Sequence, residues 1–210
     1  MKSVQYYETE FNYRGICFDY SRVCRWFSWL RCVPSGRLLD VGCGTGINRM
    51  WADRHGFQYL GVDYAYAPLN RGLIQADGVL LPFPDNSMDA VCALGSLEHF
   101  DDPRSGMREM YRVCKSGGLA VISVPNKPII ENLGLYHGTE QPQELRLTFN
   151  KWKYFIEAAG FRVVSWHKDY GGKVFKNRKP IKVLQRLLLK LTVCLPKCFA
   201  YQWIFNCKKI

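Results

Sequence analysis

The stretch at residues 38–46 restricts the possible folds of this chain more than any other. An apolar run there reaches Asp40, and Gly42, Gly44 and Gly46 then fall at alternate positions, with a helical pattern directly behind them. Glycine is needed where turn dihedrals, or the close approach of a ligand, leave no room for a Cβ atom. The pattern therefore predicts a strand, a tight turn and a helix, with a nucleotide-like ligand bound at the turn.

Apolar, strand-like runs alternate with helical spacing along the rest of the chain. This alternation is typical of a doubly wound α/β domain. Strands are expected near residues 37–41, 57–62, 88–94, 119–124, 161–166 and 173–175, and a short third apolar segment ends at residues 75–78. Helices are expected near 47–54, 102–113 and 148–159. The run at 88–94 is apolar almost throughout, which indicates a mostly parallel sheet covered on both faces.

The charge distribution divides the chain into parts. We expect an N-terminal helical lid or buttress at 1–36, a ligand-binding domain at 37–175 and a C-terminal extension at 176–210. The extension holds nine Lys/Arg and no acidic residue, so the total of 29 basic and 18 acidic residues leaves 20 against 18 for the remainder. A nearly neutral domain argues against a nucleic-acid groove, although the net charge is +11.

The C-terminal extension has amphipathic spacing. One face of the predicted helix carries six apolar residues, Val183, Leu184, Leu187, Leu188, Leu191 and Leu195. Another face carries the basic residues Lys182, Arg186 and Lys190. Four aromatic residues follow the helix, Phe199, Tyr201, Trp203 and Phe205. The helix is too charged and too short to span a bilayer. It predicts either contact with a membrane surface over residues 180–210, or a cover for the domain's own sheet or for a second copy, so a monomer and a homodimer both stay open.

The nine cysteines and the N-terminus bear on location. No cysteine spacing matches a set of metal ligands, and residues 1–7 lack an apolar run of signal-peptide length. We therefore expect reduced thiols, no metal site, and a cytoplasmic protein that can lie peripherally at a membrane.

Acidic residues end successive strand-like runs. Asp40 precedes the glycines, Asp63 lies about twenty residues after them, where such folds place a ribose-binding carboxylate, and Asp77 follows the next run. A P-loop is excluded because Gly46 is followed by Ile-Asn and not by Lys-Ser/Thr. Three carboxylates suit positively charged S-adenosylmethionine better than a dinucleotide. We expect Asp40 near the amino-acid end of S-adenosylmethionine, Asp63 at the ribose hydroxyls and Asp77 at the adenine amine.

Further short motifs follow the glycine turn in a fixed order, at residues 61–63, 76–78, 81–91, 97–103, 109–118 and 158–161. Together they resemble class I S-adenosylmethionine-dependent methyltransferases of the small-molecule "type 11" branch, over residues of about 37–166. The resemblance implies a seven-stranded Rossmann-like fold. The expected cofactor-binding residues are Asp40, Gly42, Cys43, Gly44, Gly46, Asp63, Tyr64, Asp77, Gly78, Leu94 and Gly95.

Two histidines are candidates for a catalytic base. If the methyl acceptor is a hydroxyl, the protein positions it and removes its proton. His99, just past the strand at 88–94, is the first candidate, and His137, in the irregular stretch 126–147, is the second. A pocket-lining role is the alternative for both, and Glu98 either orients His99 or faces solvent.

The expected function is S-adenosylmethionine-dependent methyl transfer to a small molecule, at a hydroxyl of a saccharide or a lipid-linked metabolite. Two alternatives stay open: a non-catalytic S-adenosylmethionine-binding scaffold, and a methyltransferase for nucleic acid or protein. Against nucleic acid, residues 95–98 read Gly-Ser-Leu-Glu where amino-directed base methyltransferases carry Asn-Pro-Pro-Tyr, and residues 124–126 hold no cysteine nucleophile.

Overall fold

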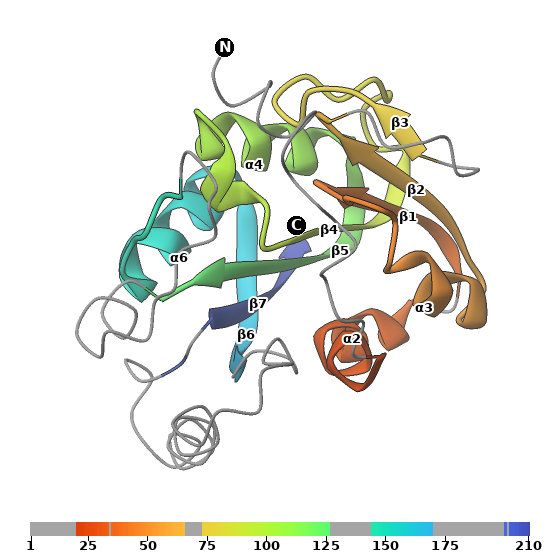
Figure 1. The fold of residues 1–210 in the computed structure, drawn as a ribbon, viewed down its shortest axis with the longest axis horizontal. Helices are drawn as coiled ribbons and strands as arrows, with labels where there is room; N and C mark the ends of the chain where they lie inside the picture. Colours follow the sequence, from red (N-terminus) through yellow and green to blue (C-terminus); the bar gives the residue numbers. More distant parts are fainter. Residues whose placement is uncertain (1–19, 34, 66–72, 127–143, 170–199, 201) are drawn as a thin grey trace, which may run out of the picture.

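Seven strands form a single sheet in the order β3-β2-β1-β4-β5-β7-β6 (Figure 1). The computed structural model describes residues 20–33, 35–65, 73–126, 144–169, 200 and 202–210. The strands are β1 Gly36–Val41, β2 Phe57–Asp63, β3 Leu73–Gln75, β4 Met88–Leu94, β5 Cys114–Pro125, β6 Phe161–Asp169 and β7 Gln202–Lys209. The first five pair in parallel, and β7 runs antiparallel to β5 and β6. The expected doubly wound, mostly parallel sheet is confirmed.

Helices cover both faces of this sheet (Figure 1). Their bounds are α2 Tyr20–Trp26, α3 Arg49–Arg54, α4 Pro103–Val113 and α6 Phe149–Ala158, with the 3-10 helices η2 Phe27–Cys32 and η3 Leu97–His99. Leu39 of β1 packs in the core under α4 and α6, and its neighbour Leu38 packs in the core under α2, η2 and α3. Successive strand residues point to opposite faces, so an apolar run without alternation fills both cores. No helix in the described ranges is long and apolar enough to cross a bilayer.

Within the N-terminal helical segment expected at 1–36, the structure describes α2 and η2. Phe27 and Leu30 are fully buried, and the ring of Phe27 lies 4.7 Å from that of Trp51 in α3. These contacts pack α2 and η2 against α3 on one face of the sheet. The remainder of the expected lid, residues 1–19, lies outside the described residues.

Of the two predictions for the end of the chain, contact with a membrane surface was wrong for residues 202–209. Residues 202–209 are not an exposed aromatic tail but strand β7, which lies between β5 and β6. Trp203 and Phe205 are buried in the main core, where both rings contact Phe149. Trp203 and Phe205 are two residues apart, as expected for side chains on one face of a strand. The helical spacing of the preceding residues 182–195 drew attention away from this period of two. The strand expected at 173–175 and the amphipathic helix lie outside the described residues.

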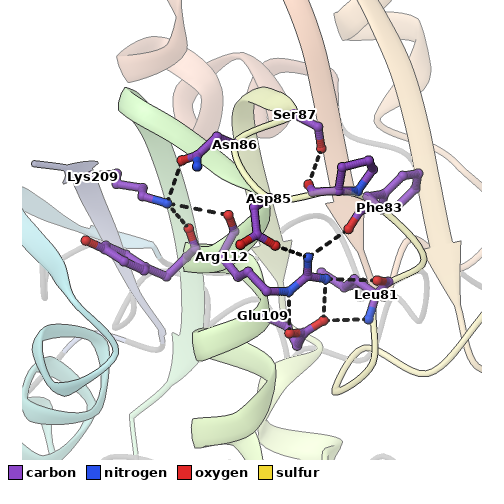
Figure 2. A network of polar contacts seen from close by, with 10 residues as sticks. Leu81, Phe83, Asp85, Asn86, Ser87, Glu109, Arg112 and Lys209 are labelled. Carbon is purple, nitrogen blue, oxygen red and sulfur yellow. Dashed lines mark hydrogen bonds and ion pairs between the residues drawn. The ribbon is translucent and has the colours of Figure 1, made fainter.

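An arginine of α4 holds the loop that precedes β4 (Figure 2). Arg112 donates to the carbonyls of Leu81 and Phe83 at 3.0 and 2.8 Å, and to the carboxylates of Asp85 and Glu109 at 2.7 Å each. Glu109 in turn accepts from the backbone N–H of Leu81 at 2.8 Å. Two of the motifs, at 81–91 and 109–118, thus meet in a structural network.

A lysine of β7 joins the same region (Figure 2). The Nζ of Lys209 donates to Oδ1 of Asn86 at 3.0 Å and to the carbonyl of Tyr111 at 2.7 Å, and it lies 4.3 Å from the centre of the Tyr111 ring. The residue is 7% exposed. Since a buried ammonium needs such partners, Lys209 fixes β7 to the end of α4.

Candidate functional site

The glycine turn lies where β1 ends. Gly42, Gly44 and Gly46 have φ of 75, 54 and 74°, in the left-handed region that glycine adopts at little cost. The backbone N–H groups of Gly42 and Cys43 donate to the carbonyl of Val62 at 2.8 and 3.0 Å. These bonds place the turn beside the carboxyl end of β2, which is the edge where open parallel sheets bind ligands.

Ser96, which was not among the predicted site residues, packs directly on the turn. A Cβ at Gly42 would stand 2.3 Å from the Cβ of Ser96, and the Ser96 hydroxyl donates to the carbonyl of Val41 at 2.7 Å. The absence of a side chain at Gly42 therefore serves packing against the segment after β4, in addition to the turn dihedrals.

Asp63 lies at the end of β2 and meets the glycine turn. Its Oδ2 accepts from the backbone N–H of Gly44 at 2.7 Å, and its Oδ1 accepts from that of Ala65 at 3.0 Å. Burial raises the pKa of this carboxyl, and the backbone hydrogen bonds from Gly44, Ala65 and Tyr64 oppose the rise. Two of the predicted cofactor-binding elements are thus in direct contact.

Asp40 does not lie where we expected it. Its carboxylate is 1% exposed and accepts from the Tyr59 hydroxyl at 2.7 Å, from Nδ2 of Asn48 at 2.9 Å and from Sγ of Cys92 at 3.3 Å. It is held beneath the turn by three side chains, and burial raises its pKa. A direct contact between Asp40 and a ligand ammonium group does not fit this position. Asp40 instead links β1, β2 and β4 to Asn48, at the start of α3.

The segment after β3 carries Asp77 and Gly78. Asp77 is exposed, and its Oδ1 accepts from the backbone N–H of Val79 at 3.0 Å. Gly78 is buried, and a Cβ there would stand 2.4 Å from the ring of Phe100. Tyr64, next to Asp63, is 49% exposed. An exposed carboxylate and an exposed aromatic ring therefore lie after neighbouring strands at the same edge.

The remaining predicted residues lie after β4. Leu94 and Gly95 are half-buried, and Gly95 has a φ of 72°. His99 ends η3 and is half-buried, with its backbone N–H donating to the carbonyl of Ser96 at 3.0 Å. His137 lies outside the described residues. Leu94, Gly95 and His99 thus stand at the carboxyl edge, as predicted.

Glu98 does not face solvent, contrary to one of the two expectations for it. It is 3% exposed, and burial raises the pKa of its carboxyl to about 8, with a further contribution from Glu144. Within the described ranges, no donor lies within hydrogen-bond reach of its Oε2.

A polar cluster on the same edge was also missed. Arg22 of α2 donates to Asp169 at the end of β6 through Nε at 2.8 Å, and to Oε1 of Gln202 at 2.9 Å. Ser123 of β5 donates to that same Oε1 at 3.4 Å. These partners are distant in the sequence, so no local spacing could have indicated them.

Known proteins share both the sequence and the fold. Residues 39–122 match the family profile described as a methyltransferase domain. A demethylmenaquinone methyltransferase of Corynebacterium urealyticum is 36% identical over 107 residues, which cover 48% of this chain and 46% of the relative. An uncharacterised methyltransferase of Mycobacterium sp. (strain KMS) is 36% identical over 107 residues, covering 47% and 42%.

Residues 39–122 of this chain therefore match a methyltransferase domain. The match confirms the resemblance drawn from the motifs. The chain spans about half the length of the curated relatives it matches.

Solved structures agree on the fold of the methyltransferase domain. An S-adenosylmethionine-dependent methyltransferase from Mesorhizobium loti superposes with a TM-score of 0.64 at 18% identity, covering 89% of this chain and 98% of that one. One from Archaeoglobus fulgidus gives 0.63 at 21% identity, covering 90% and 92%.

The residues of this methyltransferase domain fit S-adenosylmethionine. The carboxylates of Asp63 and Asp77 are hydrogen-bond acceptors suited to ribose hydroxyls and an adenine amine. The motif stretches 38–46, 61–64 and 75–78 contain no Lys or Arg, so these three stretches offer no cation to a phosphate. In the part of the chain that the structure describes, no group of three or more His, Cys, Asp or Glu residues could hold a metal ion.

Proposed function

We propose that this chain transfers a methyl group from S-adenosylmethionine to a hydroxyl of a small molecule. The observation that carries the proposal is the contact between Asp63 and Gly44, which joins the acidic end of β2 to the glycine turn at 2.7 Å. When bound, S-adenosylmethionine supplies a methyl group already activated by a positively charged sulfur.

Different residues of the domain bind different parts of S-adenosylmethionine. Asp63 accepts from the ribose hydroxyls, Asp77 accepts from the adenine amine beside the exposed Tyr64 ring, and the glycine turn admits the amino-acid portion. Asp40 acts indirectly, by holding Asn48 at the start of α3. The chain then has two tasks left, which are to orient the acceptor and to take its proton.

Support for a small-molecule acceptor comes from the relatives. Several of those matched over this segment are named demethylmenaquinone methyltransferases. Within that class we retain a saccharide or a lipid-linked metabolite as the acceptor. His99, at the carboxyl edge, and His137 are the two candidate bases that the sequence offers.

Contact with a membrane surface is a further proposal. It now rests on the basic and leucine-rich spacing at 182–195 alone, since Trp203 and Phe205 are buried in the sheet. Flotation with vesicles of anionic phospholipid tests it, using the full chain and a variant with Lys182, Arg186 and Lys190 changed to Gln. Equal flotation of the two proteins would contradict it.

Two measurements test the methyltransferase proposal. Calorimetry with S-adenosylhomocysteine should show binding to the full chain, and its absence would overturn the proposal. Release of S-adenosylhomocysteine from S-adenosylmethionine, on addition of a cell metabolite extract, should occur only with an active enzyme. Binding without any such release would favour the non-catalytic scaffold instead.

A further inference from the structure

Gly95, at the end of β4, lies between two polar side chains. A Cβ built there would stand 3.6 Å from Oε1 of Glu98 and 3.9 Å from Nε2 of Gln202. The backbone N–H of Gly95 donates to the carbonyl of Ser123 at 3.1 Å, which fixes this end of β4 against β5. A carboxyl group and a carboxamide therefore flank a position at the carboxyl edge where no side chain stands.

Glu98 is a buried acid with an unused oxygen. The residue is 3% exposed, and no donor among the described residues reaches Oε2. A buried carboxyl oxygen without a donor costs stability, and a catalytic role is one reason why a protein keeps such a group. The backbone holds Glu98 in place, because its carbonyl accepts from the N–H of Leu145 at 2.6 Å.

Gln202 presents a donor to the same space. Its Oε1 accepts from Arg22 at 2.9 Å, and an arginine can only donate, so the orientation of the amide is fixed. Nε2 is therefore the atom that points toward Gly95. The ion pair between Arg22 and Asp169 anchors this arrangement from the far side.

The charges around Glu98 come from three elements. Glu144, in the segment that covers η3, adds a negative charge and is paired with Arg146 at 3.4 Å. His99 follows Glu98 in η3, and Gln202 of β7 is neutral. Burial and Glu144 both favour the neutral acid, so the carboxyl is poised to ionise when a positive charge arrives beside it.

We propose that Glu98 takes the proton of the acceptor hydroxyl, and that Gln202 donates to an oxygen of the same acceptor. The inference rests on the proposed methyl transfer and places its base one residue before His99. It also specifies the acceptor class: a small molecule whose reactive hydroxyl has an oxygen atom nearby, such as a diol or a hydroxy-carbonyl compound.

The proton and electron balance of the step is simple. The hydroxyl oxygen forms a bond to the methyl carbon, and its proton passes to the carboxylate of Glu98, which becomes a carboxylic acid. The carbon–sulfur bond breaks and its electron pair stays on sulfur, so the products are a methyl ether and the neutral thioether. Solvent then takes the proton from Glu98.

The test compares two ligands on the full chain. The side-chain carboxyl of Glu98 is titrated by 13C NMR between about pH 6 and about pH 10, with saturating S-adenosylmethionine or S-adenosylhomocysteine. Glu98→Gln identifies the resonance by its loss. Glu157, an exposed carboxyl of α6, serves as the internal control in the same samples.

The positive sulfur of S-adenosylmethionine should lower the pKa of Glu98 by about one unit or more relative to the thioether complex, with Glu157 unchanged. Equal titration of Glu98 in the two complexes would overturn the inference and leave the methyltransferase proposal standing. Failure of both ligands to bind would instead remove the proposed function on which it rests.

Turnover gives a second readout. Using the metabolite extract, Glu98→Gln should lower the release of S-adenosylhomocysteine about 100-fold, with ligand affinity within about twofold of the wild type. It should also remove the rise of the rate with pH that a carboxylate base causes. A variant that keeps roughly a third of the wild-type rate, with the same pH profile, would contradict the role of Glu98.

Discussion

The hydroxyl of Tyr59 donates a 2.7 Å hydrogen bond to Oδ2 of Asp40, joining β2 to the acid that begins the glycine turn. Both residues are buried, so neither can turn to water if its partner is removed. The contact makes Asp40 a structural acid.

Tyr59→Phe should therefore lower the free energy of unfolding by about 1–3 kcal/mol, because it leaves a buried carboxylate oxygen with one donor fewer. Urea unfolding followed by circular dichroism measures the change. Tyr154→Phe, at an exposed position of α6, is the matched control and should alter stability by less than about 0.5 kcal/mol. Equal effects of the two substitutions would contradict the assignment.

Asp63→Asn should weaken S-adenosylhomocysteine binding about 10- to 100-fold. Hydrogen bonds to a charged group contribute about 1.5–3 kcal/mol, and each 1.4 kcal/mol corresponds to a factor of about ten. Calorimetry measures the affinity, and Asp53→Asn, an exposed carboxylate of α3, is the control. An affinity of Asp63→Asn within about twofold of the wild type would exclude Asp63 from the cofactor site.

The buried Glu98 should make stability fall with rising pH. Its pKa is raised by burial from 4.5 to about 8, so the native state keeps a proton that the unfolded chain loses. The corresponding stabilisation is complete below about pH 4.5 and is lost as the pH rises toward about 8, at up to about 1.4 kcal/mol per unit.

Urea unfolding of the wild type and of Glu98→Gln across this range measures the effect. The variant lacks the titrating proton, so it should gain stability relative to the wild type as the pH rises, and the difference should level off above about pH 8. Glu157→Gln should show no such trend. Parallel curves for the wild type and Glu98→Gln would mean that Glu98 titrates normally.

Lys209→Met should destabilise the protein by about 1–3 kcal/mol, since it removes the donor that satisfies Asn86 and the carbonyl of Tyr111 while keeping the apolar stem. Lys208→Met, at the less buried neighbouring position, should cost less than about 0.5 kcal/mol. Thermal unfolding of the two variants checks the contrast. A cost at Lys208 as large as that at Lys209 would contradict the anchoring role.

Local patterns predicted the parallel half of the molecule well. A pattern of only a few residues was enough to predict the glycine turn after β1 and the acidic residues near the ends of β1 and β2. Backbone dihedrals and strand period act over the same short range. The order of the motifs then indicated the methyltransferase family and the edge of the sheet at which the ligand is expected to bind.

What the sequence could not show depended on contacts between distant residues. Asp40 and Asp63 both end strands, and only the packing of Tyr59 and Asn48 distinguishes the buried acid from the one that meets the turn. The pairing of Arg22 with Gln202 joins the two ends of the described chain. The aromatic spacing of 199–205 fitted a membrane-facing tail as well as a strand.

Among the described strands, β6 pairs only with β7, since the order is β5-β7-β6. Residues 161–169 are synthesised well before residues 202–209. During synthesis, β6 therefore cannot form its backbone hydrogen bonds with β7 until the end of the chain has emerged. Closing so long a loop is entropically costly and slows folding. Assembly of this edge should therefore be the late step, and chaperones or self-association would act on the nascent protein there.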